Sequence, residues 1–146
     1  MTIKLNIGFA ATAIAPYYAE EQKVRIKSEQ HLQQLLKNYD VNIISFTKTI
    51  FSKDDAIEAE KFFKNKIDFL LIQTSSCSAG EQLYPLCNTS NKIGIWAVPD
   101  LEHEGDVKLH SLVSTSHFLG IIKKLLIDKN IKTKWFYNYA DTEEFI

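Results

Sequence analysis

The chain has 146 residues, of which 45% are hydrophobic, and its 17 Lys and Arg against 18 Asp and Glu give a formal net charge of −1. This length suits a single globular domain over residues 1–146, and the balanced charge argues against a nucleic-acid partner or an anionic membrane surface. Because no apolar run reaches the length of a membrane span and the N-terminal residues lack a signal-peptide layout, we expect a cytoplasmic protein.

Strand and helix patterns alternate along the whole chain. The expected strands are residues 3–9, 41–46, 67–72, 92–98 and 133–137, and the expected helices are residues 16–38, 53–65, 79–87 and 112–128. Pro16 suits a first helical turn, and Ser52 is a good N-cap residue with Asp54 and Asp55 behind it. Strands separated by helices require right-handed crossovers. The sequence therefore predicts an α/β fold, a three-layer αβα sandwich with a five-stranded parallel sheet of the flavodoxin-like or Rossmann-like kind.

A small and polar loop, Gln73 to Gly80, is expected to follow the third strand, and ligands of parallel sheets bind beyond the carboxyl ends of the strands. Backbone N–H groups at the start of the next helix suit an anion. However, the loop lacks the spacings of nucleotide-binding motifs and contains one glycine, so we do not favour nucleotide binding. The alternative is that its serines make only local hydrogen bonds.

Two cysteines, Cys77 and Cys87, lie ten positions apart without a CxxC pair, which disfavours a zinc site. Cys77 follows a strand and precedes a helix, a position that lowers the pKa of a thiol. No His or Asp partner can be assigned to it from the sequence. We therefore favour two reduced, small side chains over a nucleophilic Cys77.

Residues 100–106 carry four carboxylates together with His103, which suits a metal site or an acid–base pair. A loop does not fix the geometry of such groups, so we favour a solvated charged loop. His110 and His117 flank the start of the last helix, where capping or core roles are the commoner ones. Residues 141–144 look like the start of a helix, so the chain has either a frayed end or a continuation into a further domain.

Aromatic residues near the same sheet edge have two open roles. Trp96 is either a core residue of its strand or presents its indole to a sugar ring, since it combines apolar area with an N–H donor. Tyr17 and Tyr18, which follow the loop after the first strand, are expected to rim this edge.

Several of these segments together resemble the N-terminal domain of the L-fucose/L-arabinose isomerase superfamily. In that family a Trp-x-x-Pro-acidic segment, a glycine and an Asn-Ser-Leu-like segment occur in this order, and nearly the whole chain takes part in the likeness. The corresponding segments here are Ile95-Trp96-Ala97-Val98-Pro99, Glu104-Gly105-Asp106 and Leu109-His110-Ser111-Leu112-Val113, followed by the tail Lys134-Trp135-Phe136-Tyr137.

The resemblance implies an aldose–ketose isomerase that uses a divalent metal, usually Mn²⁺, and moves a proton at C2 with carboxylates. It also implies that the metal ligands and catalytic carboxylates lie in later domains, so this chain would hold neither and would be inactive alone. In the family this domain helps close the sugar pocket of a neighbouring subunit. The implied roles are Trp96 as a sugar-stacking residue, Thr12 as a pocket edge and His117 as a hydroxyl contact, with a sugar ligand and a homo-oligomer or separate catalytic domains as partners.

The chain departs from the family pattern at two places. His110 stands where Asn is common, and Ser114-Thr115-Ser116 stands where Gly-x-Asn often follows. These departures leave the sugar open and keep two alternatives: a stand-alone sugar- or protein-binding regulatory module without catalysis, and a small α/β enzyme that uses Cys77 or the loop of His103.

Overall fold

The computed structural model describes residues 4–15, 18–99, 110–140 and 142, and confirms the α/β class. Five strands form one sheet in the order β2-β1-β3-β4-β5, and every neighbouring pair is parallel. The elements in chain order are β1 (Leu5–Thr12), α1 (Tyr18–Leu36), β2 (Val41–Ser45), α2 (Lys53–Phe63), β3 (Phe69–Thr74), the 3₁₀ turn η2 (Gly80–Gln82), α3 (Leu83–Leu86), β4 (Lys92–Ala97), α4 (Ser111–Leu125), the 3₁₀ turn η3 (Ile127–Lys129) and β5 (Lys132–Tyr137).

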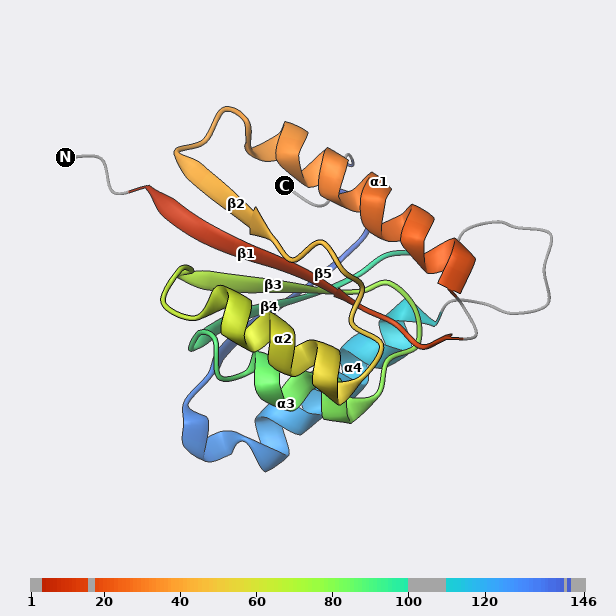
Figure 1. Cartoon of the computed structure of the whole chain (residues 1–146), viewed down its shortest axis with the longest axis vertical. Helices are drawn as coiled ribbons and strands as arrows, with labels where there is room; N and C mark the ends of the chain where they lie inside the picture. The colour runs from red at the N-terminus through yellow and green to blue at the C-terminus, as the bar shows by residue number, and fades with distance from the viewer. Residues whose placement is uncertain (1–3, 16–17, 100–109, 141, 143–146) are drawn as a thin grey trace.

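The helices cover the two faces of the sheet unequally. Helix α1 lies on one face, while α2, α3 and α4 lie on the other (Figure 1). Successive residues of a strand point to opposite faces, so Leu71 and Trp96 join the apolar cluster under α1, whereas Ile72 and Ile95 join the larger cluster under the other helices. The result is the predicted three-layer sandwich.

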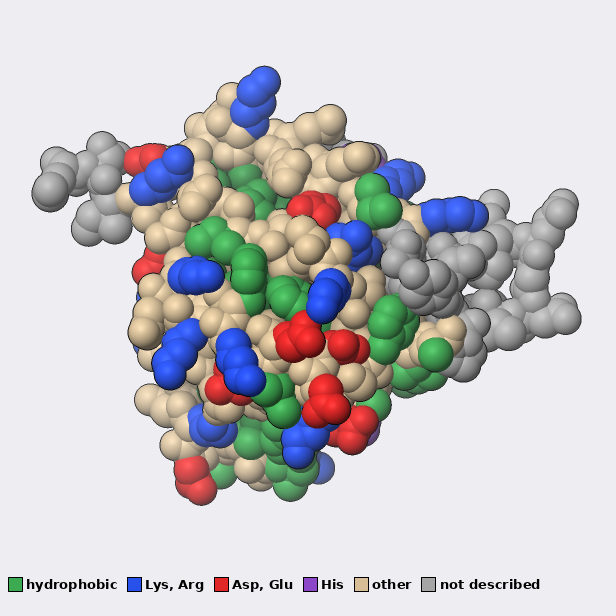
Figure 2. Space-filling model, in the orientation of Figure 1, with side chains coloured by type: hydrophobic (Ala, Val, Ile, Leu, Met, Phe, Trp, Pro, Cys, Tyr) green, Lys and Arg blue, Asp and Glu red, His purple; other side chains and the backbone are tan. Residues whose placement is uncertain are grey.

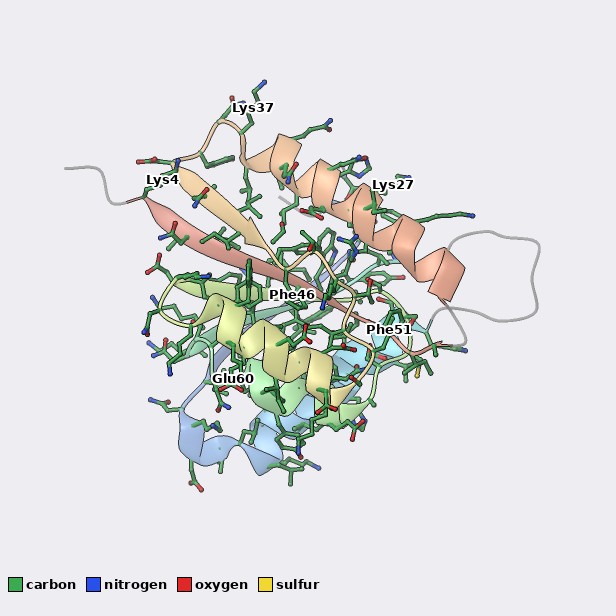
Figure 3. The ribbon with its side chains drawn as sticks, in the orientation of Figure 1. Lys4, Lys27, Lys37, Phe46, Phe51 and Glu60 are labelled. Carbon is green, nitrogen blue, oxygen red and sulfur yellow. The ribbon has the colours of Figure 1, made fainter. Side chains whose placement is uncertain are left out.

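Helix α2 begins as the sequence predicts. The Asp55 amide donates to the Ser52 hydroxyl at 3.1 Å and the Asp55 carboxylate accepts from the Ser52 amide at 3.0 Å, which is a complete capping box. Phe46, at the end of β2, packs against Phe62 and Phe63 with ring centroids 5.6 and 6.3 Å away, and Figure 3 shows its side chain between sheet and helix. This aromatic contact holds α2 on the sheet.

Several predicted boundaries were wrong near the carboxyl ends of the strands. Strand β1 runs on to Thr12 and β3 to Thr74, so Gln73 and Thr74 belong to the sheet and not to the loop. They stay in the strand because the ladder continues: Thr12 pairs with Thr74, Thr74 with Ala97, and the Ser75 amide donates to the Thr12 carbonyl. The third helix is also shorter than expected, a 3₁₀ turn followed by four residues.

The surface carries both signs of charge. On the face drawn in Figure 2, Lys and Arg side chains alternate with Asp and Glu without a field of one sign. Within the described part of the chain, no helix is long and apolar enough to cross a membrane.

Candidate functional site

Buried polar side chains concentrate at the carboxyl edge of the sheet. Of the twelve buried polar residues in the described chain, ten lie at the ends of β1 and β3, in the loop after β3, or in the first turns of the helices that follow. None of the twelve is charged. The ten are Thr12, Gln73, Thr74, Ser75, Ser76, Ser78, Gln82, Ser111, Ser114 and Thr115. Burial of polar groups costs free energy unless hydrogen bonds compensate, so their arrangement needs an explanation.

One group of hydroxyls joins α4 to the middle of the sheet. The Thr74 hydroxyl lies 2.8 Å from the Thr115 hydroxyl and donates to the Ser111 carbonyl at 2.9 Å. The Ser111 hydroxyl in turn donates to the Thr74 carbonyl and accepts from the Val98 amide at 3.0 Å. These bonds fix the start of α4 against the ends of β3 and β4.

A second group ties the loop after β3 to its neighbours. The Ser78 hydroxyl lies 2.8 Å from the Thr12 hydroxyl, and the Ser78 amide donates to the Ser114 hydroxyl at 2.7 Å. The Gln82 side chain donates to the Ala13 carbonyl at 2.9 Å. The loop is therefore a fixed rim that presents hydroxyl and backbone groups beside β1 and α4.

Gln73 differs from the other buried polar residues because half of its amide is unpaired. The Ser75 hydroxyl donates to Gln73 Oε1 at 2.9 Å, whereas Gln73 Nε2 has no hydrogen-bond partner among the described residues although Gln73 is 0% exposed. Its register neighbours are Ala11 and Trp96, so the side chain lies on the α1 side of the edge. A buried donor without an acceptor costs about 1–3 kcal/mol. Such a group is typical of places where a ligand or water completes the bonding.

The N-terminus of α4 also lies at this edge. Its N-cap residue His110 has a left-handed backbone, φ 57° and ψ 34°, and supplies no side-chain cap. The first turn of a helix has N–H groups without partners inside the helix. The first turn of α4 places such N–H groups at the carboxyl edge.

The residues proposed from the sequence have different surroundings in the structure. Thr12 lies inside the site, where its hydroxyl contacts Ser78. Trp96 is 0% exposed, packs 6.3 Å from the Phe9 ring and donates from its indole to the Asn138 carbonyl at 2.7 Å. Of its two open roles, this burial and pairing are those of a core residue.

His117 and Tyr17 have other outcomes. His117 is exposed on α4 and lies over Gly80, where a Cβ would come within 2.9 Å of His117 Nε2. Tyr17 and the acidic loop of residues 100–106 lie outside the described residues. Sequence reasoning included Gln73 in the candidate loop but missed Ser111 and Thr115 as parts of the site, because only the start of α4 brings these two to the same edge.

The two cysteines lie at different ends of the molecule. Cys77 is half-buried in the loop at the carboxyl edge, while Cys87 is buried beside the turn that precedes β4. Burial raises the pKa of the Cys87 thiol from 9.0 to about 12. Among the described residues, no three His, Cys, Asp or Glu side chains come together to hold a metal ion. The resemblance implies that the Mn²⁺ ligands lie in later domains, so this finding does not bear on that expectation.

Comparison with known proteins adds no family. Neither the search against protein-family models nor the search of curated proteins finds a match to this chain.

Proposed function

We propose that this domain binds a small, neutral, polyhydroxylated ligand, a sugar, at the carboxyl edge of its sheet. In this proposal it is the substrate-proximal domain of an aldose–ketose isomerase-like protein. The observation that carries the binding proposal is the gathering of ten buried, uncharged polar side chains at the one edge where parallel sheets bind ligands.

The residue types favour a neutral ligand over an anionic one. Sugar hydroxyls both donate and accept hydrogen bonds, and Ser, Thr and Gln side chains offer the same two functions. Anions such as phosphate are usually held by Arg or Lys, and none of the buried polar residues of the described edge carries a charge. A sugar therefore fits this edge better than its phosphate ester.

The unpaired half of the Gln73 amide supports the same proposal. The Ser75 hydroxyl already occupies Oε1, so Nε2 is the end that a ligand oxygen would meet. A site built to bond a particular oxygen rejects compounds that lack it, because its own polar group then stays buried and unpaired. Gln73 would thus contribute to selection among sugars.

The proposal assigns binding, not proton transfer, to this chain. Isomerisation needs an acid–base pair, and the buried polar side chains of the described edge are hydroxyls and amides, whose proton affinities do not suit that work near neutral pH. Proton transfer and the metal would be supplied by other domains, as the resemblance implies.

Isothermal titration calorimetry tests the binding proposal. We expect heat on titration with L-fucose, L-arabinose or a related neutral sugar, and weaker binding of the corresponding sugar phosphate. Cys77→Trp, which fills space at the part-exposed rim, should abolish the heat, whereas Asn91→Trp, an exposed position at the opposite edge, should leave it unchanged. Absence of heat with every neutral sugar, or tighter binding of the phosphate, would contradict the proposal.

A further inference from the structure

Strand β5 is an edge strand, and no strand of the described residues lies beside its outer edge. Four consecutive residues from Lys132 to Trp135 and then Tyr137 are exposed, whereas in β2, the other edge strand, only Asn42 is exposed. Trp135 is 56% and Tyr137 44% exposed. An edge strand offers unpaired backbone groups to another strand, and its lysines, here Lys132 and Lys134, restrict which strands can pair with it.

The hydrogen-bonding phase of β5 shows which backbone groups are available. The amides of Lys132 and Asn138 donate to carbonyls of Asn91 and Ala97, which places the even-numbered residues of the strand toward β4. Backbone groups alternate in direction along a strand. The N–H and C=O groups of every second residue, Thr133, Trp135 and Tyr137, therefore point outward.

From these features we infer that β5 pairs with β5 of a second copy of this chain, antiparallel, about a twofold axis at Trp135. In this register Trp135 faces its own copy, and Thr133 faces the partner's Tyr137. Each of the three outward-facing residues then meets another outward-facing residue, which is the arrangement of hydrogen-bonded antiparallel pairs. A closed dimer of this kind uses one patch on both copies.

Charge selects this register over its neighbour. With the axis at Trp135, Lys134 lies opposite the partner's Phe136 and Lys132 lies opposite the partner's Asn138. No lysine therefore lies directly opposite another lysine. Moving the axis to Lys134 would place that lysine directly opposite its own copy, and like charges directly opposite one another destabilise a sheet. Lys134 already lies over the Phe136 ring of its own chain at 5.8 Å, a contact that the partner's ring would extend.

Shape supports the same partner on the α4 side of the sheet. Trp135 is in register with Ile95, which belongs to the cluster under α4, so the exposed indole lies on that face. Beside it a groove of about 620 Å³ runs between α4 and β5, lined by Leu119, Lys123, Ile127 and Thr133 among others. Since Thr133 would face the partner's Tyr137, that ring would enter the groove and cover its apolar side chains.

Sedimentation of the whole chain over a wide concentration range tests the inference. We expect twice the mass of one chain at high concentration, and a single chain's mass for Trp135→Lys, because a lysine at the axis meets its own copy. Tyr39→Lys is the matched control: Tyr39 is 57% exposed, in the turn after α1, and its substitution should leave the dimer intact. A wild-type chain that stays monomeric, or a dimer that survives Trp135→Lys, would overturn the inference.

A crosslink reads the register directly and does not depend on the Trp135 variant folding. In a Cys77→Ser background, Thr133→Cys together with Tyr137→Cys should form disulfides between copies, giving a chain of doubled mass without reductant. Thr133→Cys alone should not, because the two copies of that residue would be about 13 Å apart along the strands, beyond the reach of a disulfide. Equal crosslinking of both variants would contradict the register, and a crosslink to a different protein would indicate that β5 serves another partner.

Discussion

The two ends of the sheet treat polar groups in opposite ways. At the amino edge, turns around Asp40, Lys66 and Asn91 are exposed, and water can satisfy their polar groups. At the carboxyl edge, hydroxyls and amides are buried and bonded to one another, and the Nε2 end of Gln73 has no partner within the described part of the chain. The amino edge only connects elements. At the carboxyl edge, polar groups are buried at a cost in free energy that stability alone does not explain. This contrast is the main reason to place function at the carboxyl edge.

Thiol chemistry should separate the two edges most sharply. Cys77 is half-buried at the carboxyl edge, while Cys87 is buried with its pKa raised to about 12 by burial. Because the thiolate is the reactive form, we expect one thiol per native chain to react with a disulfide reagent, and the second only on unfolding. A native Cys77→Ser chain whose remaining thiol still reacts would show that Cys87 is accessible. Two thiols reacting at equal rates in the native wild type would contradict the difference in burial as well.

The Cys87 shift also predicts a pH dependence with a definite sign. The unfolded thiol ionises near 9.0 and the folded thiol only near 12, so in this interval the unfolded state binds fewer protons. Stability from this group is present below pH 9 and falls as the pH rises toward 12. The difference in unfolding free energy between the wild type and Cys87→Ala should therefore shrink across that range in urea titrations.

Thr74→Val tests the hydroxyl network of the carboxyl edge. The substitution keeps the shape of the side chain but leaves the Thr115 and Ser111 hydroxyls without this partner, and we expect a loss of about 2–3 kcal/mol in urea unfolding. Thr89→Val is the control near the amino edge, where the hydroxyl donates only to the Leu86 carbonyl, and should cost about 1 kcal/mol. Equal losses at the two positions would remove the contrast.

Substitutions of two glycines by alanine should change stability in opposite directions. A Cβ on Gly80 would come within 2.7 Å of the Ile121 side chain and 2.9 Å of His117, so Gly80→Ala should cost about 1 kcal/mol. Gly120, in the interior of α4, has open space around the same atom, and Gly120→Ala should stabilise by up to about 1 kcal/mol. Thermal unfolding of both variants measures the difference, and a shared sign would contradict the packing at Gly80.

The smallest stability effect is expected where the functional effect is largest. Gln73→Met with Ser75→Ala removes both hydrogen-bonding partners and the unpaired amide end together. Such a paired replacement is nearly neutral for stability, within about 1 kcal/mol, yet it removes the donor proposed to meet the sugar. Calorimetry should show lost sugar binding in a chain that unfolds like the wild type. A large loss of stability with sugar binding retained would mean that Gln73 serves stability and not binding.

The fold was predictable because strand and helix periods are local features. The ends of β1 and β3 were not, since Thr12, Gln73 and Thr74 look like loop residues until the parallel ladder pairs them. Nor was the hydroxyl network, because Thr74 and Ser111 are 37 residues apart. The place of β5 at the open edge depends on the sheet order, which strand patterns alone do not fix.

Mapping of amide chemical shifts during a sugar titration shows directly whether a neutral sugar binds at the carboxyl edge. We expect shifts in residues 12–15, 75–80 and 110–114, and unchanged signals in the amino-edge turns at 39–40, 64–67 and 88–91. Saturating concentrations of every neutral sugar without a shift at the carboxyl edge, or shifts confined to the amino edge, would contradict binding at the carboxyl edge.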